Sequence, residues 1–68
     1  MKDRIKRVSF DDAEQICMEM RSVGFGESPD AIKTAGGWVV VAWKAGGKIG
    51  VLCNDGEILA VSPESILA

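Results

Sequence analysis

The residues of this chain that could do chemistry are two cysteines, five serines and a set of carboxylates. Nucleophilic catalysis by cysteine or serine needs a neighbouring base, most often histidine, to remove the proton. The chain contains no histidine. Cys17 and Cys53 lie within apolar stretches far apart in the sequence, which favours buried, reduced thiols. We therefore predict that the protein is not an enzyme.

A glycine-rich stretch, Gly46 to Gly50, has the composition of a phosphate-binding loop. Such a loop places serine or threonine directly after its lysine and leads into a helix. Here Ile49 follows Lys48, and the next residues are typical of a strand. The stretch Asn54 to Glu57 also lacks the ligand spacing of a calcium loop. Both stretches are predicted to be hairpin turns, and no metal or cofactor is expected.

Length and composition limit the classes of protein that this chain can form. Its 68 residues allow one domain, 1–68, and 47% hydrophobic residues are typical of a folded protein. The net charge of −2 provides no overall attraction to nucleic acid or anionic lipid. No apolar run approaches the roughly 20 residues that cross a bilayer. The expectation is a cytoplasmic protein without a membrane partner.

The first predicted element is an amphipathic helix that begins near Ser9. Ser9 and Asp12 have the spacing of a capping box, in which the side chain of the first residue satisfies a free backbone N–H. Four apolar residues follow at the spacing of one helix face: Ala13, Ile16, Cys17 and Met20. Gly24 is suited to the left-handed conformation that ends many helices, so the helix should end there.

Short apolar stretches separated by glycine turns follow the helix and predict an antiparallel meander. The turns are Gly36-Gly37, Gly46-Gly47 and Asn54-Asp55-Gly56. The predicted strands are 31–35, 38–44, 48–53 and 57–61, and residues 4–8 offer a fifth, edge strand. Ser62-Pro63-Glu64 predicts a short C-terminal helical turn. The fold class is therefore α+β, with a helix packed on a four-stranded antiparallel sheet.

Two-residue turns at Gly46-Gly47 and Asp55-Gly56 would set the strand register and sort the side chains onto two faces. One face would carry Ile32, Val39, Val41, Trp43, Leu52, Leu59 and Val61. The other would carry Trp38, Val40, Ala42, Ile49, Val51, Cys53, Ile58 and Ala60. Both sets are apolar, whereas the long helix can cover only one face. The second face is expected to be covered by a curled sheet, a second copy of the chain or another protein.

Charge is distributed unevenly along the chain. Residues 11–30 carry six acids and one base, whereas residues 1–7 carry four bases and one acid. The acidic helix would give specificity to a protein contact made by the apolar sheet face. The residues predicted for this contact are Trp38, Val40, Ile49, Val51, Ile58, Asp11, Asp12, Glu14 and Glu19.

An alternative is a small nucleic-acid-binding domain that uses the basic residues, with Trp38 or Trp43 stacking on bases. Its contact residues would be Lys2, Arg4, Lys6, Arg7, Lys44 and Lys48. Such binding would weaken steeply with salt. A third alternative is a purely structural homodimer whose sheets pack face to face.

The predicted order of elements, a helix, a meander and a short final helix, resembles the double-stranded-RNA-binding domain in topology. That family contacts phosphate through basic residues at the start of its last helix, whereas the segment 62–68 here carries Glu64 and no lysine or arginine. The glycine turns and paired strands also look like a small SH3-like barrel, which is the alternative fold. In size, acidity and lack of catalytic residues the chain is similar to small phage-encoded inhibitors, anti-CRISPR proteins among them.

These observations favour one function over the alternatives. We expect a non-catalytic protein-binding module that acts by occupying a surface of a partner, which is the mode of action that the resemblance to small inhibitors implies. The partner would be another protein, or a second copy of the chain, on the second face of the sheet.

Overall fold

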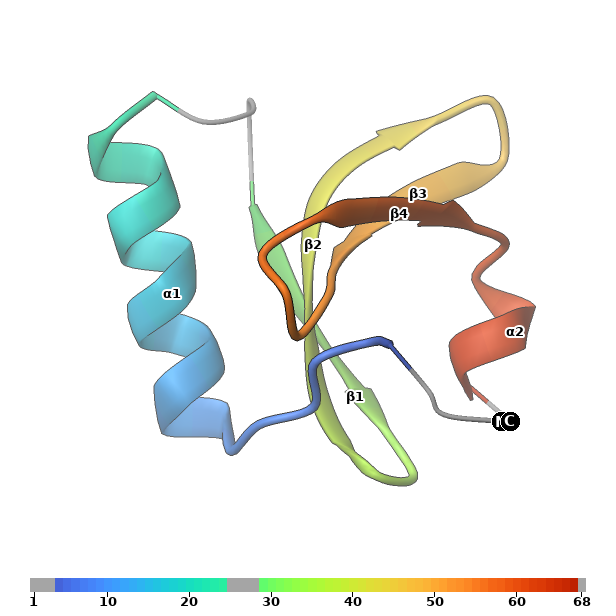
Figure 1. The fold of residues 1–68 in the computed structure, drawn as a ribbon, viewed down its shortest axis with the longest axis horizontal. Helices are drawn as coiled ribbons and strands as arrows, with labels where there is room; N and C mark the ends of the chain where they lie inside the picture. The colour runs from blue at the N-terminus through green and yellow to red at the C-terminus, as the bar shows by residue number, and fades with distance from the viewer. Residues whose placement is uncertain (1–3, 25–28, 68) are drawn as a thin grey trace.

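The protein forms a four-stranded antiparallel sheet with one helix on each of its faces (Figure 1). The computed structural model describes residues 4–24 and 29–67. Their elements are α1 (Phe10–Ser22), β1 (Asp30–Thr34), β2 (Gly37–Ala45), β3 (Lys48–Leu52), β4 (Ile58–Val61) and α2 (Glu64–Leu67). The strands lie in the order β1-β2-β3-β4. The predicted α+β fold is confirmed, and the sheet is not closed into the alternative barrel.

Local signals at both ends of α1 explain where the helix begins and ends. The backbone N–H of Asp12 donates a hydrogen bond of 3.2 Å to Oγ of Ser9, the N-cap residue. This bond satisfies one of the N–H groups that a helix leaves free at its start. After Val23 the backbone of Gly24 takes a φ of +74°, which a residue without a β-carbon adopts at low cost.

The β2–β3 hairpin turns at the residues that the sequence predicts. Gly46 and Gly47 have φ values of +57° and +78°, as a two-residue turn between twisted strands requires. The β1–β2 turn lies one residue earlier than predicted, at Ala35 and Gly36. It is supported by the Thr34 hydroxyl, which donates a hydrogen bond of 2.7 Å to the carbonyl oxygen of Gly37.

The register of β3 differs from the prediction. A β-bulge between Val41 and Trp43 inserts one extra residue into β2, so that Val51 pairs with Val41. With a regular ladder after the Gly46-Gly47 turn, Val51 would have paired with Ala42 instead. Because a one-residue shift moves every side chain to the opposite face, Ile49 and Val51 lie on the face away from α1.

The β3–β4 connection also differs, and its effect on the register opposes that of the bulge. The predicted two-residue turn is replaced by three residues, 54–56, between Cys53 and Glu57. Ile58 therefore pairs with Leu52, and both lie on the α1 side of the sheet. The two one-residue shifts cancel, so β4 has its predicted orientation relative to β2 although β3 does not.

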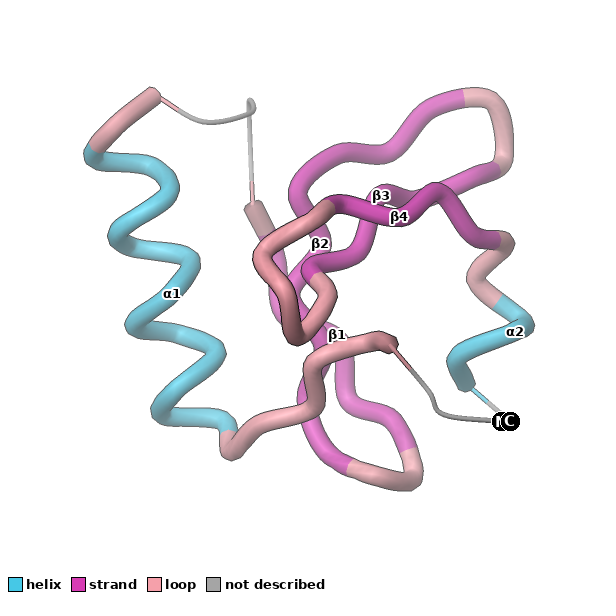
Figure 2. Tube along the Cα trace, viewed as in Figure 1, coloured by secondary structure: helices cyan, strands magenta, loops and turns pink. Residues whose placement is uncertain are grey.

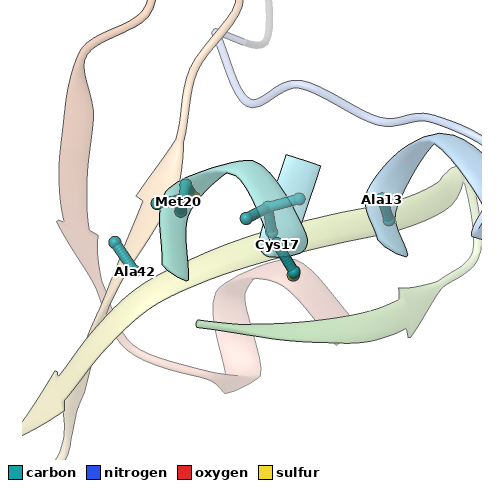
Figure 3. Close-up of a cluster of buried hydrophobic side chains, with 5 residues drawn as sticks. Ala13, Cys17, Met20 and Ala42 are labelled. Atoms are coloured by element: carbon teal, nitrogen blue, oxygen red, sulfur yellow. The ribbon is translucent and has the colours of Figure 1, made fainter. Parts of the chain in front are cut away.

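Two clusters of buried side chains result, one on each face of the sheet. Five buried residues lie between α1 and the sheet: Ala13, Cys17, Met20, Val40 and Ala42. Figure 3 labels all of them except Val40. Ile66 of α2 joins four strand residues on the other face: Val39, Val41, Ile49 and Val51. Both apolar faces of the central strand β2 are therefore covered within the chain.

Residues 4–8 cross the end of the sheet without forming a fifth strand (Figure 2). Val8 and Trp38 exchange two backbone hydrogen bonds of 2.7 and 3.0 Å, and Ile5 forms a second isolated bridge with Cys53. Between them, the N–H of Lys6 donates to the carbonyl oxygen of Leu52 at 3.0 Å. The edge strand considered at 4–8 is thus a bridging segment that joins the ends of β2 and β3.

Candidate protein-binding surface

The two cysteines, the strongest nucleophiles identified in the sequence, are enclosed in the fold. Cys17 and Cys53 are buried free thiols, as predicted. Burial of Cys17 raises the pKa of its thiol above the usual value, and nearby Arg21 only partly opposes this. Over residues 4–24 and 29–67, no three His, Cys, Asp or Glu side chains gather to hold a metal ion. Nor is any helix in these ranges long and apolar enough to cross a membrane.

The predicted apolar contact face is wrong in its central residues. Val40, Ile49 and Val51 are at most 4% exposed and therefore cannot contact a partner. They also belong to different faces, because Val40 packs beneath α1 whereas Ile49 and Val51 pack with Ile66 of α2. There are two physical reasons: α1 covers the face of β2 that carries Val40, and the β2 bulge turns Ile49 and Val51 to the opposite face, which α2 covers.

Trp38 and Ile58, the other two apolar residues of the prediction, are half-buried on the α1 side of the sheet. The Trp38 ring makes an edge-to-face contact with Phe10, with 4.8 Å between ring centroids. Trp38 therefore anchors the start of α1 to β2. Ile58 lies further along the sheet, on β4.

The four predicted acidic residues are all exposed on α1, but they do not share one side of the helix. Glu14 faces β1, because it lines a groove of about 250 Å³ between α1 and β1. The other lining residues are Phe10, Cys17, Arg21, Asp30 and Ala31. With 3.6 residues per turn, Asp12 and Glu19 project to the opposite flank, on the side of β3 and β4, and Asp11 points outward.

The α1 side of the sheet is only partly covered. The helix packs on β1 and β2, whereas on β3 and β4 Leu52 and Ile58 pack only partly against the buried cluster and remain half-buried. Register places Gly50 and Leu52 of β3, and their partners Ala60 and Ile58 of β4, on this side. Ala60 is exposed, and Leu52 and Ile58 are half-buried.

Trp43 completes this apolar area. It pairs with Gly50 across the β2–β3 ladder, and its indole ring lies over that glycine. The residue is 40% exposed, so a large apolar side chain lies partly at the surface here. We call the set Trp43, Leu52, Ile58 and Ala60 the open sheet surface.

Trp43 was not among the predicted contact residues because it was assigned to the other face of the sheet, whereas Ala60 was assigned to the correct face but was not included in the contact. One signal could have indicated the site. A tryptophan directly across a hairpin from a glycine is a known way to cover a glycine within a strand. With the turn at Gly46-Gly47 correctly predicted, this pairing of Trp43 with Gly50 follows by counting along the strands.

The basic residues of the nucleic-acid alternative do not form one patch. Arg4 pairs with Asp55 at 3.2 Å, and Lys44 lies 3.7 Å from Asp30. Lys6 and Arg7 are half-buried near the start of β2, whereas Lys44 and Lys48 lie at its far end. Lys2 is outside the described residues. Trp38 and Trp43 are likewise separated along β2, so they do not form one stacking platform.

We also compared the chain with protein-family models, with curated proteins and with solved structures. None of the three comparisons gives a match.

Proposed function

We propose that this protein is a non-catalytic protein-binding module that acts by occupying a surface of a partner protein. The contact would be made by the open sheet surface, together with Asp12 and Glu19 on the adjoining flank of α1. The observation that supports this proposal is the apolar area formed by exposed Trp43 and Ala60 with half-buried Ile58. Apolar surface centred on a tryptophan is typical of protein contacts.

The charges around the open sheet surface favour a protein over a nucleic acid as the partner. The flank of α1 that borders it carries two carboxylates, which would repel phosphate groups. The basic residues, in contrast, are scattered, and two of those that the structure describes are paired with acids.

The proposal is tested with a charge placed in the centre of the open sheet surface. Ala60→Glu changes an exposed side chain on β4, and Ala35→Glu makes the same change at an exposed turn residue far from it. Proteins captured from cell extract by the wild type are identified, purified and titrated against all three forms. Ala60→Glu should weaken the affinity by at least about tenfold, or about 1.4 kcal/mol, and Ala35→Glu should leave it unchanged.

Circular dichroism and thermal unfolding would first establish that both variants are folded. Equal affinity of the two variants for the purified partner would contradict the proposal. Sedimentation of the protein alone gives a second check. A stable dimer that Ala60→Glu dissociates would assign the surface to self-association and would also overturn the proposal.

A further inference from the structure

The four strands of the sheet have room for two helices on the α1 side, and the chain provides one. Neighbouring strands are about 4.8 Å apart, so β3 and β4 lie about one helix diameter to the side of β1 and β2. Helices that pack side by side have axes 8–10 Å apart. A helix placed over β3 and β4 would therefore contact both the sheet and the flank of α1.

We infer that the open sheet surface is the binding site for an amphipathic helix of the partner protein, with basic residues along the edge that meets α1. This inference rests on the proposed function and adds the shape and charge of the bound segment. The apolar stripe of such a helix would lie on Leu52, Ile58 and Ala60. The ring of Trp43, which extends over Gly50, would close one end of the site.

The flank of α1 beside this site indicates the charge of the partner helix. Asp12, Ile16, Glu19 and Val23 follow one another at i, i+4, i+7 and i+11, so they form one row along the helix. Ile16 is half-buried and Val23 is 77% exposed, which extends the apolar surface up the side of α1. The carboxylates of Asp12 and Glu19 form no ion pair with any residue in the described ranges. They are therefore available to arginine or lysine.

The same charges argue against a second copy of this chain as the occupant. Within residues 4–24 and 29–67, the only long helix that a second copy could offer is α1, whose exposed residues include Asp11, Asp12, Glu14 and Glu19. Placing that helix beside Asp12 and Glu19 would bring like charges together. Lys48 is exposed at the start of β3. There it could form an ion pair with one acidic side chain of an otherwise basic partner helix.

The size of the site limits the length of the bound helix. β4 has four residues and is therefore about 13 Å long. At 1.5 Å per residue, about nine helical residues span that distance. Two to three turns of helix are thus enough to cover the surface, and Leu or Met at i, i+3, i+4 and i+7 would provide the apolar stripe.

A synthetic peptide tests the inference on the complete chain. The probe has about 18 residues, with leucine at heptad positions a, d and e, arginine at g and glutamine elsewhere. One control peptide carries glutamate in place of arginine, and a second carries a central proline that prevents a continuous helix. Binding is followed by the NMR signals of the Trp43 indole N–H and of the Leu52 and Ile58 amides, during titration.

The expected result is saturable binding of the arginine peptide that shifts these three signals. Glu19→Gln should weaken it by about three- to tenfold, in keeping with a charge-assisted hydrogen bond. Glu14→Gln removes the same charge from the opposite flank of α1 and should leave the affinity unchanged. Both residues are exposed, so both variants should fold.

Three results would overturn the inference: equal binding of the proline peptide, equal loss in Glu14→Gln and Glu19→Gln, or shifts confined to another surface. The captured partner separates the two proposals. If Ala60→Glu abolishes binding of that partner but no helical peptide binds, the protein-binding function stands and the helix inference fails. If Ala60→Glu has no effect on the partner either, both fail.

Discussion

The indole ring of Trp43 lies directly over the backbone of Gly50. A β-carbon built at Gly50 would overlap Cε2 and Nε1 of the indole, so only glycine leaves room for the ring. The bulge between Val41 and Trp43 brings the tryptophan to this side of the sheet, which is the side of the open sheet surface. The partly exposed tryptophan and the buried glycine therefore act as one structural unit.

Gly50→Ala should destabilise the protein because the added methyl group must displace the Trp43 ring. Overpacking of this kind costs about 1–3 kcal/mol. The same change made together with Trp43→Ala should cost clearly less, since the obstructing ring is gone. Urea unfolding of the wild type, both single variants and the double variant measures this coupling. Equal cost of Gly50→Ala in both backgrounds would show that the ring does not restrict this position.

Val51→Asp should prevent folding. Val51 is fully buried in the cluster under α2, and an unpaired buried carboxylate costs several kcal/mol. A domain of this size has a total stability of about 5 kcal/mol. The matched control is Val23→Asp, which makes the same change at a 77% exposed residue and should leave the fold intact. A folded Val51→Asp protein by circular dichroism would indicate that this face is not core.

Ser9→Ala should destabilise α1 by about 1 kcal/mol, the usual cost of losing an N-cap side chain. The hydrogen bond from the Asp12 N–H would be lost, leaving that group without its partner. Ser9→Asn should restore most of the stability. Ser22→Ala, at the other end of the helix, removes only a hydroxyl that donates to the Glu19 carbonyl oxygen and should cost less. Urea unfolding that ranks Ser22→Ala above Ser9→Ala in cost would contradict the assignment of the cap.

Asp55 should titrate below the usual value for an aspartate. The N–H of Glu57 donates a 3.0 Å hydrogen bond to its carboxylate, and this bond is the main cause of the lowered pKa, with Arg4 adding to it. Because the folded pKa is the lower one, this interaction stabilises the protein above the unfolded pKa of about 3.9. The contribution disappears as the pH falls through the folded pKa.

Carboxyl NMR signals followed against pH measure the Asp55 pKa directly. Arg4→Ala should raise that pKa only in part, since the backbone hydrogen bond remains. A pKa at or above the unfolded value in the wild type would refute the assigned interaction. A full return to the unfolded value in Arg4→Ala would instead assign the effect to the ion pair alone.

Much of the fold could be predicted because its signals are local. Ser9 and Gly24 mark the ends of α1 through bonds and dihedral angles within one helical turn. Gly46 and Gly47 determine a hairpin because their own backbones adopt positive φ. Each of these preferences depends on neighbours in sequence, so the amino-acid order alone was sufficient to locate the helices, the strands and the antiparallel order of the sheet.

The candidate contact surface could be predicted only in part. The acidic character of α1 is visible in the sequence, and all four predicted carboxylates are exposed. Which flank each one occupies depends on how α1 sits over β1 and β2, and this is a property of tertiary packing. Val40 was placed in the contact because α1 was expected on the other face of β2, whereas α1 covers the face that carries Val40. Ile49 and Val51 were placed there because the bulge in β2 was not predicted, and Ile66 of α2 covers them.

The sequence alone therefore determined the elements of this protein, their order and the charge of its helix. Tertiary structure decided the register of β3 and, with it, which apolar residues remain exposed. The bulge beside Trp43 and the three-residue turn at 54–56 each shift the ladder by one residue. The bulge does not follow from local preference, because it depends on side chains that meet across strands: Trp43 over Gly50, and Val51 against Val41.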